Sequence, residues 1–430
     1  MRKLKATIIL CTALGLVLSF SASSSSIAAG PVQVTMWVNG DCPPATCPEA
    51  ALIKGFEAAN PNIKIKLISQ PPDNYWATLK AAVVTGTGPD LADMFAGGYM
   101  TPFKKYMVDA RKYVPANLIS QSIGTNFYSE GNSNKNAVYA IPRENQFYIG
   151  FYNKKIFADN GITKIPSSWS ELSAVSAKLA KAGIRPIVDG AQGGSAQIEP
   201  LFEFSYLATA HPIADWTKLL NGKLAFDNPI LRQQVTSWAD LYKKGYINKD
   251  AYNYPNTEKD FTDGKAAMFL GTGSWELPAI AKIMGDNLGV MVPPYSPTGK
   301  KMLIALPGAG YTMFKASKHQ VEAGKFQAFM LSDAGQQILA DLGQPPTRPG
   351  FKTSLAPMND LLKISGTAGL NVYPMFDNFT QPAVTDAIHK KIAQALVGQL
   401  TASQALKAID SATASLPADL RNAALNFDGK

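Results

Sequence analysis

The sequence predicts an α/β protein of two domains, each a mostly parallel β-sheet flanked by helices. Strand-like and helix-like segments alternate from residue 33 to residue 95 in the β-α-β-α-β order of a parallel sheet covered by helices. A second α/β pattern runs from about 150 to 300. The chain has 430 residues, which is more than one hydrophobic core usually supports. Because 46% of the residues are hydrophobic, the chain can form two cores.

The first domain is expected to begin with the alternating strand 33–38. A helix over 48–59 follows, because Pro48 suits a first helical turn and Leu52 and Phe56 lie four residues apart on one face. The remaining elements of this unit are a strand at 63–68, a helix at 74–85, a turn at 86–90 and a strand at Leu91–Phe95.

The segment 139–153 is polar at its centre and strand-like at both ends, so it could cross between the two domains. A strand-like stretch, Met302–Phe314, contains the glycine pair Gly308 and Gly310. Helices are expected near 170–182, 230–244, 257–263, 319–331, 333–342, 382–397 and 402–413.

The first 28 residues have the order of a cleavable export signal. Three basic residues precede an apolar run from Ile8 to Phe20, and small residues end at Ala28, after which we expect cleavage. A membrane anchor is the alternative, but the run has about 13 residues where a spanning helix needs roughly 20. The mature chain is therefore expected to be soluble.

Composition argues against two kinds of site. Without the signal the formal charge of +9 falls by three to +6, and no basic stripe interleaves with aromatics, so we expect no nucleic-acid partner. Cys42 and Cys47 are expected to form a local disulfide in an oxidising compartment. Zinc is the alternative there, but a second cysteine pair is missing and His211, His319 and His389 are far apart. We therefore expect no metal and no cofactor.

Short motifs follow one another along nearly the whole mature chain. They are Met36-Trp37, residues 56–65 (FEAANPNIKI), Gly88-Pro89-Asp90, 137–142 (AVYAIP), 151–154 (FYNK), 166–172 (PSSWSEL), 261–268 (FTDGKAAM) and Gly273-Ser274-Trp275. Each is weak alone, but their joint order resembles the extracellular solute-binding proteins of ABC importers, family 1, the maltose-binding-protein-like group.

The resemblance implies a two-lobed periplasmic-binding-protein fold of type II, in which two α/β lobes joined by hinge crossings close over a ligand. Lobe one would take residues 29–143 and 302–348, and lobe two 144–301 and 349–430. It also implies a monomer in the periplasm that binds a carbohydrate and delivers it to the permease subunits of an inner-membrane ABC importer.

Sugar chemistry indicates which side chains to expect in the cleft. Aromatic rings stack on the C–H faces of a sugar, and polar side chains pair with its hydroxyls. Trp275 resembles the family's stacking tryptophan, with a core tryptophan as the alternative. The expected ligand-binding residues are Asn39, Asp41, Phe95, Glu144, Asn145, Gln146, Glu199, Trp275, Gly310, Arg348 and Tyr373. Tyr373, Phe376 and Phe379 are not separable as the last aromatic of the cleft.

Position supports the polar members of this set. Asn39 and Asp41 follow the first strand and Phe95 ends the third, where parallel sheets bind ligands. Residues 144–146 fall where the family's first crossing lines the cleft, and Glu199 resembles a second-lobe acid on a looser match. For Asp41 and Glu144 the alternative is a solvated surface carboxylate.

The sequence leaves two other functions as alternatives. A phosphorylated polyol such as glycerol 3-phosphate is the runner-up ligand, because Arg143 and Arg348 would suit a phosphate. A secreted hydrolase is a remote alternative, because the sequence contains no G-x-S-x-G, S-x-x-K, H-E-x-x-H or G-x-x-x-x-G-K-[ST] motif. We therefore expect a binding protein and no enzyme.

Overall fold

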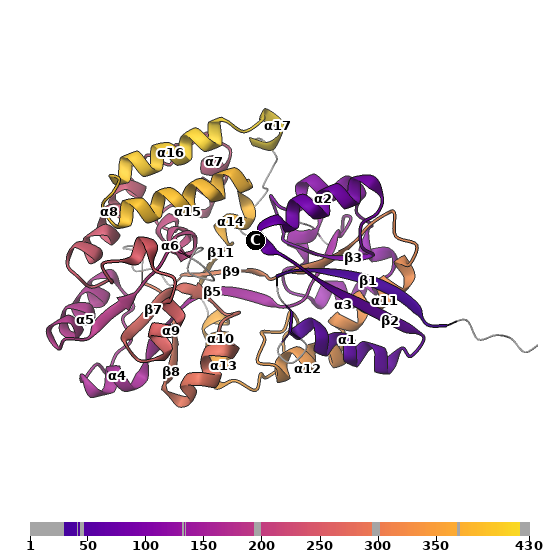
Figure 1. Ribbon diagram of the computed structural model, residues 1–430, viewed down its shortest axis with the longest axis horizontal. Helices are drawn as coiled ribbons and strands as arrows, with labels where there is room; N and C mark the ends of the chain where they lie inside the picture. The colour runs from indigo at the N-terminus through magenta and orange to yellow at the C-terminus, as the bar shows by residue number, and fades with distance from the viewer. Residues whose placement is uncertain are drawn as a thin grey trace, which may run out of the picture.

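The computed structural model describes residues 30–40, 42–43, 47–130, 133, 135–192, 199–294, 302–367 and 370–421. Within these ranges the chain forms two α/β lobes, each centred on one sheet (Figure 1). The expected export signal and Asp41 lie outside the described residues. No helix within these ranges is long and apolar enough to cross a membrane.

The sheet of the first lobe has the strand order β2-β1-β3-β10-β4. Its strands are β1 (Val32–Asn39), β2 (Ile63–Gln70), β3 (Leu91–Met94), β4 (Ala140–Pro142) and β10 (Gly310–Met313). β1 is parallel to β2 and β3, whereas β10 is antiparallel to β3 and β4. The carboxyl ends of β1 and β3 therefore meet at one edge of the sheet.

Helices cover both faces of this sheet, with α2 on one side and α1 and α12 on the other (Figure 1). They are α1 (Pro48–Ala59), α2 (Tyr75–Thr85), α3 (Ala116–Gln121), α11 (Gln320–Leu331) and α12 (Asp333–Asp341). α1 begins at Pro48 and buries Leu52 and Phe56, and the Phe56 ring lies 5.3 Å from that of Phe326 in α11. Gly86 caps the C-terminal end of α2, and its φ of 73° is the left-handed conformation that glycine supplies at helix ends.

The sheet of the second lobe has the order β11-β9-β5-β7-β6, with β8 also paired to β5. Its strands are β5 (Asn145–Asn153), β6 (Arg185–Val188), β7 (Ala266–Gly273), β8 (Leu288–Met291), β9 (Met302–Pro307) and β11 (Asn371–Tyr373). β5 runs against β7, β8 and β9, and the other pairings are parallel. β5 and β9 extend between the lobes (Figure 1).

The helices of the second lobe surround this sheet. They are α4 (Lys154–Asp159), α5 (Trp169–Lys181), α6 (Glu199–Ala208), α7 (Ile213–Leu220), α8 (Pro229–Lys243), α9 (Thr257–Thr262), α10 (Leu277–Met284), α13 (Ala356–Ser365), α14 (Phe376–Phe379), α15 (Pro382–Leu396), α16 (Ala402–Ala414) and α17 (Ala418–Arg421). α15 packs on α16, α6 and α8, so the last long helices belong to this lobe.

The two-lobed fold class is confirmed. Each sheet is mostly parallel and contains one antiparallel strand, which is β10 in the first lobe and β5 in the second. The strand β9 belongs to the second sheet, although the expected lobe boundary assigned its residues to lobe one. β9 begins at Met302, where we placed the return to lobe one, but it pairs with β5 and β11 in the second sheet. We therefore propose that the return crossing lies at residues 308–309, between β9 and β10.

The lobes also touch away from the crossings. The amide of Gly98, in the loop after β3, donates to the carbonyl of Asn378 in α14 at 2.8 Å. A Cβ on Gly98 would lie 2.2 Å from the carbonyl oxygen of Thr380, so this close approach requires glycine. The loop after β3 and the segment around α14 therefore lie in direct contact.

Candidate functional site

A cleft of about 590 Å³ lies between the lobes, within the usual size of ligand pockets. Four of the expected ligand-binding residues line it: Asn39, Phe95, Gln146 and Trp275. They come from the end of β1, the residue after β3, the crossing strand β5 and the turn after β7. The structure thus brings together residues that are up to 236 positions apart in the sequence.

Asn39 and Asp93 both line the cleft, and each has a buried acceptor atom without a partner. Asp93 is the third residue of the buried strand β3, is 5% exposed, and accepts a hydrogen bond at Oδ2 from the amide of Asn39 at 3.4 Å. Oδ1 of Asp93 and Oδ1 of Asn39 are buried without a hydrogen-bond partner. Burial raises the pKa of the Asp93 carboxyl to about 7, and the nearby Glu144 carboxylate also raises it. An unmet buried acceptor costs about 1–3 kcal/mol, so the pair suits a ligand that donates hydrogen bonds.

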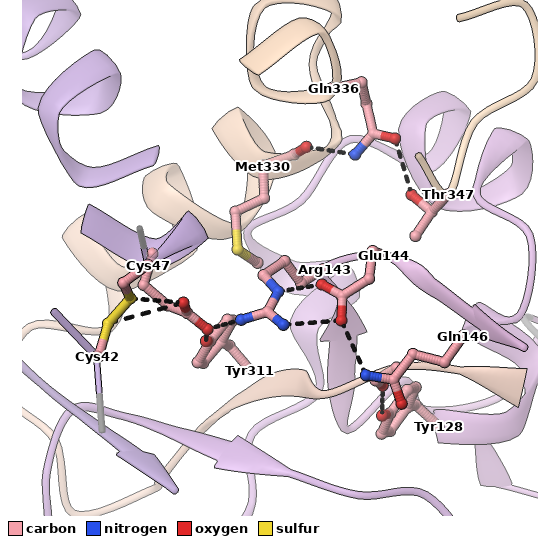
Figure 2. A network of polar contacts seen from close by, with 12 residues as sticks. Cys42, Cys47, Tyr128, Arg143, Glu144, Gln146, Tyr311, Met330, Gln336 and Thr347 are labelled. Atoms are coloured by element: carbon pink, nitrogen blue, oxygen red, sulfur yellow. Dashed lines mark hydrogen bonds and ion pairs between the residues drawn. A yellow bond between two sulfur atoms is a disulfide. The ribbon is translucent and has the colours of Figure 1, made fainter. Parts of the chain in front are cut away.

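Arg143 lies between two carboxylates at the floor of the cleft (Figure 2). Its guanidinium pairs with Glu49 of α1 on one side, and Nη2 donates to Glu144 Oε1 at 2.8 Å on the other. Glu144 Oε1 also accepts from Gln146 Nε2 at 3.1 Å, and the hydroxyl of Tyr311 donates to Glu49. The charge of Arg143 is therefore neutralised within the protein.

The disulfide between Cys42 and Cys47 is present and forms part of the cleft wall. The Sγ of Cys47 lies 2.9 Å from Glu49 Oε2, which is a contact and no hydrogen bond, because a disulfide has no S–H group. Among the described residues, these three side chains are the group whose ligand atoms lie within 4.8 Å. A disulfide supplies no thiolate, so in the oxidised form this group is not a metal site.

Trp275 is held over the cleft by the turn that contains it. The amide of Ser274 donates to the carbonyl of Phe147 in β5 at 2.9 Å, and Phe147 N donates to Ser274 Oγ at 3.1 Å. The Trp275 ring packs over Gly273, where a Cβ would lie 2.0 Å from ring atoms. The Trp275 and Tyr148 rings form an edge-to-face pair with centroids 5.8 Å apart. Trp275 therefore has a fixed ring at the wall, as stacking on a sugar face requires.

A second aromatic group comes from the first lobe. The Phe95 ring lies 5.3 Å from that of Trp76 and 5.6 Å from that of Tyr99, and Phe95 is half-buried at the cleft. Burial raises the pKa of Tyr99, and the nearby Asp377 carboxylate raises it further. Asp377 in turn accepts the Tyr148 hydroxyl at 2.6 Å.

Other expected site residues lie outside the cleft lining. Glu144 is 1% exposed and pairs with Arg143 below the wall. Asn145 and Arg348 line a different hollow, on the far side of the crossing strand. A Cβ on Gly310 would lie 2.8 Å from the Tyr128 ring, so this glycine admits a buried tyrosine.

Glu199 is fully buried inside the second lobe with two other acids. Its Oε2 accepts from the amide of Gly190 at 2.9 Å, and its Oε1 accepts from the Thr257 hydroxyl. Burial and mutual repulsion with Asp189 raise its pKa well above the usual range, and Glu203 is shifted in the same way. Burial therefore favours the protonated forms of these carboxyls, and the cluster lies away from the described cleft lining.

Tyr373, Phe376 and Phe379, the three candidates for the last aromatic of the cleft, also lie away from the cleft lining. Tyr373 packs on Trp216 with ring centroids 5.1 Å apart, and its hydroxyl donates to the carbonyl of His211 at 3.2 Å. Phe376 and Phe379 are 0% and 3% exposed, in the core.

The structure adds Glu49, Asp93 and Arg143 to the cleft. The acid at position 93 carries a signal in the sequence itself. It interrupts the apolar run Leu91-Ala92-Asp93-Met94-Phe95, and a carboxylate inside a buried strand needs a partner or a function. Glu49 carries no such local signal, and Arg143 is expected from the sequence only as a candidate phosphate contact.

Comparisons with known proteins agree with this architecture. The family model described as "Bacterial extracellular solute-binding protein" matches residues 51–360. A multiple sugar-binding protein of Streptococcus mutans is 23% identical over 74% of this chain and 76% of its own length. The sn-glycerol-3-phosphate-binding periplasmic protein UgpB of Salmonella typhimurium is 22% identical over 92% and 94%.

Among solved structures, a chitin oligosaccharide binding protein superposes with a TM-score of 0.75 and 22% identity. The match covers 89% of this chain and 98% of that one, so the two share a fold. Together with the family match over residues 51–360, these findings show that the chain belongs to the bacterial extracellular solute-binding proteins.

Proposed function

We propose that this protein is the solute-binding component of an ABC importer, and that it captures an uncharged sugar or oligosaccharide in the cleft and delivers it to the membrane permease. The observation that carries the proposal is the pair of unmatched acceptors, Asn39 Oδ1 and Asp93 Oδ1, at a wall that also presents Trp275 and Phe95. Hydroxyl groups donate to such acceptors, and C–H faces stack on such rings. Relatives named as sugar-binding proteins support the same class of ligand.

A phosphorylated polyol fits the cleft less well. Phosphate oxygens at neutral pH are acceptors and need cationic donors, but the guanidinium of Arg143 is already paired with Glu49 and Glu144. Lys282, exposed at the rim, is the other cation among the described lining residues. The site therefore favours a neutral ligand, although one relative is named for glycerol 3-phosphate.

The remaining parts of the proposal follow from the family and the sequence. We propose export to the periplasm with cleavage near Ala28, a monomeric state, and a role without catalysis. The ligand contacts are proposed to come from Asn39, Phe95, Asp93, Gln146 and Trp275, with Asp41 as a further member.

A thermal-shift screen of residues 29–430 tests the proposal. The panel is neutral mono- and oligosaccharides, sugar phosphates, polyamines and amino acids. A ligand at 100 times its Kd should stabilise the protein by about 2.7 kcal/mol. We expect a rise with neutral sugars; a rise with phosphate esters alone would replace the proposal with the runner-up, and turnover of any substrate would indicate an enzyme.

A further inference from the structure

A second hollow of about 410 Å³ lies on the other face of the hinge, and we call it the hinge pocket. Asn145 and Phe147 of β5 line it, whereas Gln146 between them lines the cleft, because successive side chains of a strand point to opposite faces. Its other walls include Ile123 and Phe127 of the first lobe and Val372 of the second. An occupant would therefore touch both lobes without entering the cleft.

The walls of the hinge pocket are mostly apolar and open to solvent at the rim. Ile123 is 55% exposed and Val372 is 48% exposed. The two residues lie on different lobes and face the same hollow. Exposed apolar side chains gathered around a concave site favour binding of an apolar group there.

One charged residue, Arg348, is present among the described residues that line the hinge pocket. The buried Gln336 positions it, because Gln336 Oε1 accepts from the Arg348 amide at 3.1 Å and from Thr347 Oγ1 at 3.2 Å. Gln336 is itself held by a hydrogen bond from its Nε2 to the carbonyl of Met330 at 2.8 Å (Figure 2). The arginine is thus fixed in place by the fold of α12.

The guanidinium of Arg348 is incompletely paired. Nη1 donates to the carbonyl of Leu331 at 3.0 Å and pairs with Asp333, but Nε is buried without a hydrogen-bond partner. The Asp333 side chain is 85% exposed, so solvent and salt screen this ion pair. A planar guanidinium with an unused donor matches the geometry of a carboxylate.

We propose that the hinge pocket is a second binding site, for a small amphipathic monocarboxylate whose anionic head pairs with Arg348 and whose apolar body lies against Ile123, Phe127 and Val372. The apolar walls disfavour a sugar, and the single fixed cation disfavours a neutral hydrocarbon or an amine. This site is separate from the ligand cleft and does not depend on what the cleft binds.

Titration calorimetry of residues 29–430 with hexanoate, hexan-1-ol and hexylamine tests the proposal. We expect hexanoate to bind saturably at one site, and the alcohol and the amine to bind at least tenfold more weakly. Arg348→Gln should weaken hexanoate at least tenfold and leave hexan-1-ol unchanged. Absence of saturable hexanoate binding, equal binding of the alcohol, or equal binding by the variant would each overturn the proposal.

A surface variant keeps the test decisive if Arg348→Gln does not fold. Ile123→Asp adds a negative charge at the rim of the hinge pocket and should also weaken hexanoate at least tenfold. Ile230→Asp is the matched control, because Ile230 is 43% exposed in the first turn of α8 and lies outside the pocket. Equal weakening by both aspartates would show a general charge effect and would contradict the assigned site.

Discussion

Replacing Asp93 by Asn separates ligand recognition from stability. The substitution keeps the shape of the side chain and removes its negative charge. Asp93 Oδ1 is buried without a partner, and we expect a ligand hydroxyl to donate to it. A hydrogen bond to a charged group contributes about 1.5–3 kcal/mol, so the variant should bind the sugar about 10- to 150-fold more weakly.

The pH dependence follows from the same carboxyl. Burial raises the pKa of Asp93 to about 7, and the ionised form is the better acceptor for hydroxyl groups. At pH 6 about one tenth of the protein would carry the carboxylate, so affinity should be about tenfold weaker than at pH 9. Binding should therefore tighten as pH rises through 7, and Asp93→Asn should abolish this dependence.

Stability should change in the opposite sense. Because the folded pKa lies above the unfolded value of 3.8, the native state holds a proton that the unfolded chain releases between about pH 4 and pH 7. This group therefore lowers the free energy of unfolding as pH rises, and Asp93→Asn should remove that loss. Calorimetry of the best sugar from the screen, at pH 6 and 9, with urea unfolding in parallel, measures both effects. Unchanged affinity together with altered stability would refute a ligand contact for Asp93.

Three further predictions concern Trp275, Gly273 and Glu203. Trp275→Ala should weaken sugar binding by about 2–4 kcal/mol, and Trp275→Phe by less; a loss of stability with unchanged affinity would place the ring in the core. Gly273→Ala should also weaken binding, because its Cβ would lie 2.0 Å from the Trp275 ring, and near-normal affinity would contradict the assigned ring position. Because burial raises the pKa of Glu203, the free energy of unfolding should fall less steeply above about pH 5 in Glu203→Gln than in the wild type. If the urea midpoint of the variant changed with pH as much as that of the wild type, the raised pKa of Glu203 would be contradicted.

Local patterns were sufficient to predict most of the fold. The helix at 48–59 matches α1, and the helix at 402–413 matches α16 to within one residue, because apolar spacing and end signals are local properties. The lobe to which β9 belongs depended on which strands it pairs with. Two strand-like segments separated by Gly308 have the same local pattern whether they join one sheet or two.

In the crossing strand β5, neighbouring residues have different roles that the sequence alone does not distinguish. Residues 144–146 were all expected in the cleft, but alternation along β5 places Gln146 at the cleft and Asn145 at the hinge pocket. The sequence predicts that successive side chains alternate between the two faces of the strand, but it does not predict which face each side chain takes. The face is set by the pairing of Asn145 with Pro307, and the Asn145 side chain is anchored by the carbonyl of Pro346.

The net charge around Arg143 depends on carboxylates that the fold brings to it, one of them from a distant part of the sequence. In the sequence Arg143 suited a phosphate, and the runner-up ligand rested partly on it. In the fold, α1 brings Glu49 against the guanidinium from 94 residues away, and Glu144 closes on it from the other side. Two carboxylates on one guanidinium leave no net positive charge at the floor, so an anionic ligand would lose its attraction there and meet Asp93 as well. The class of ligand is therefore decided by which carboxylates the fold brings to Arg143, because a cation attracts an anion only where no protein carboxylate has already neutralised it.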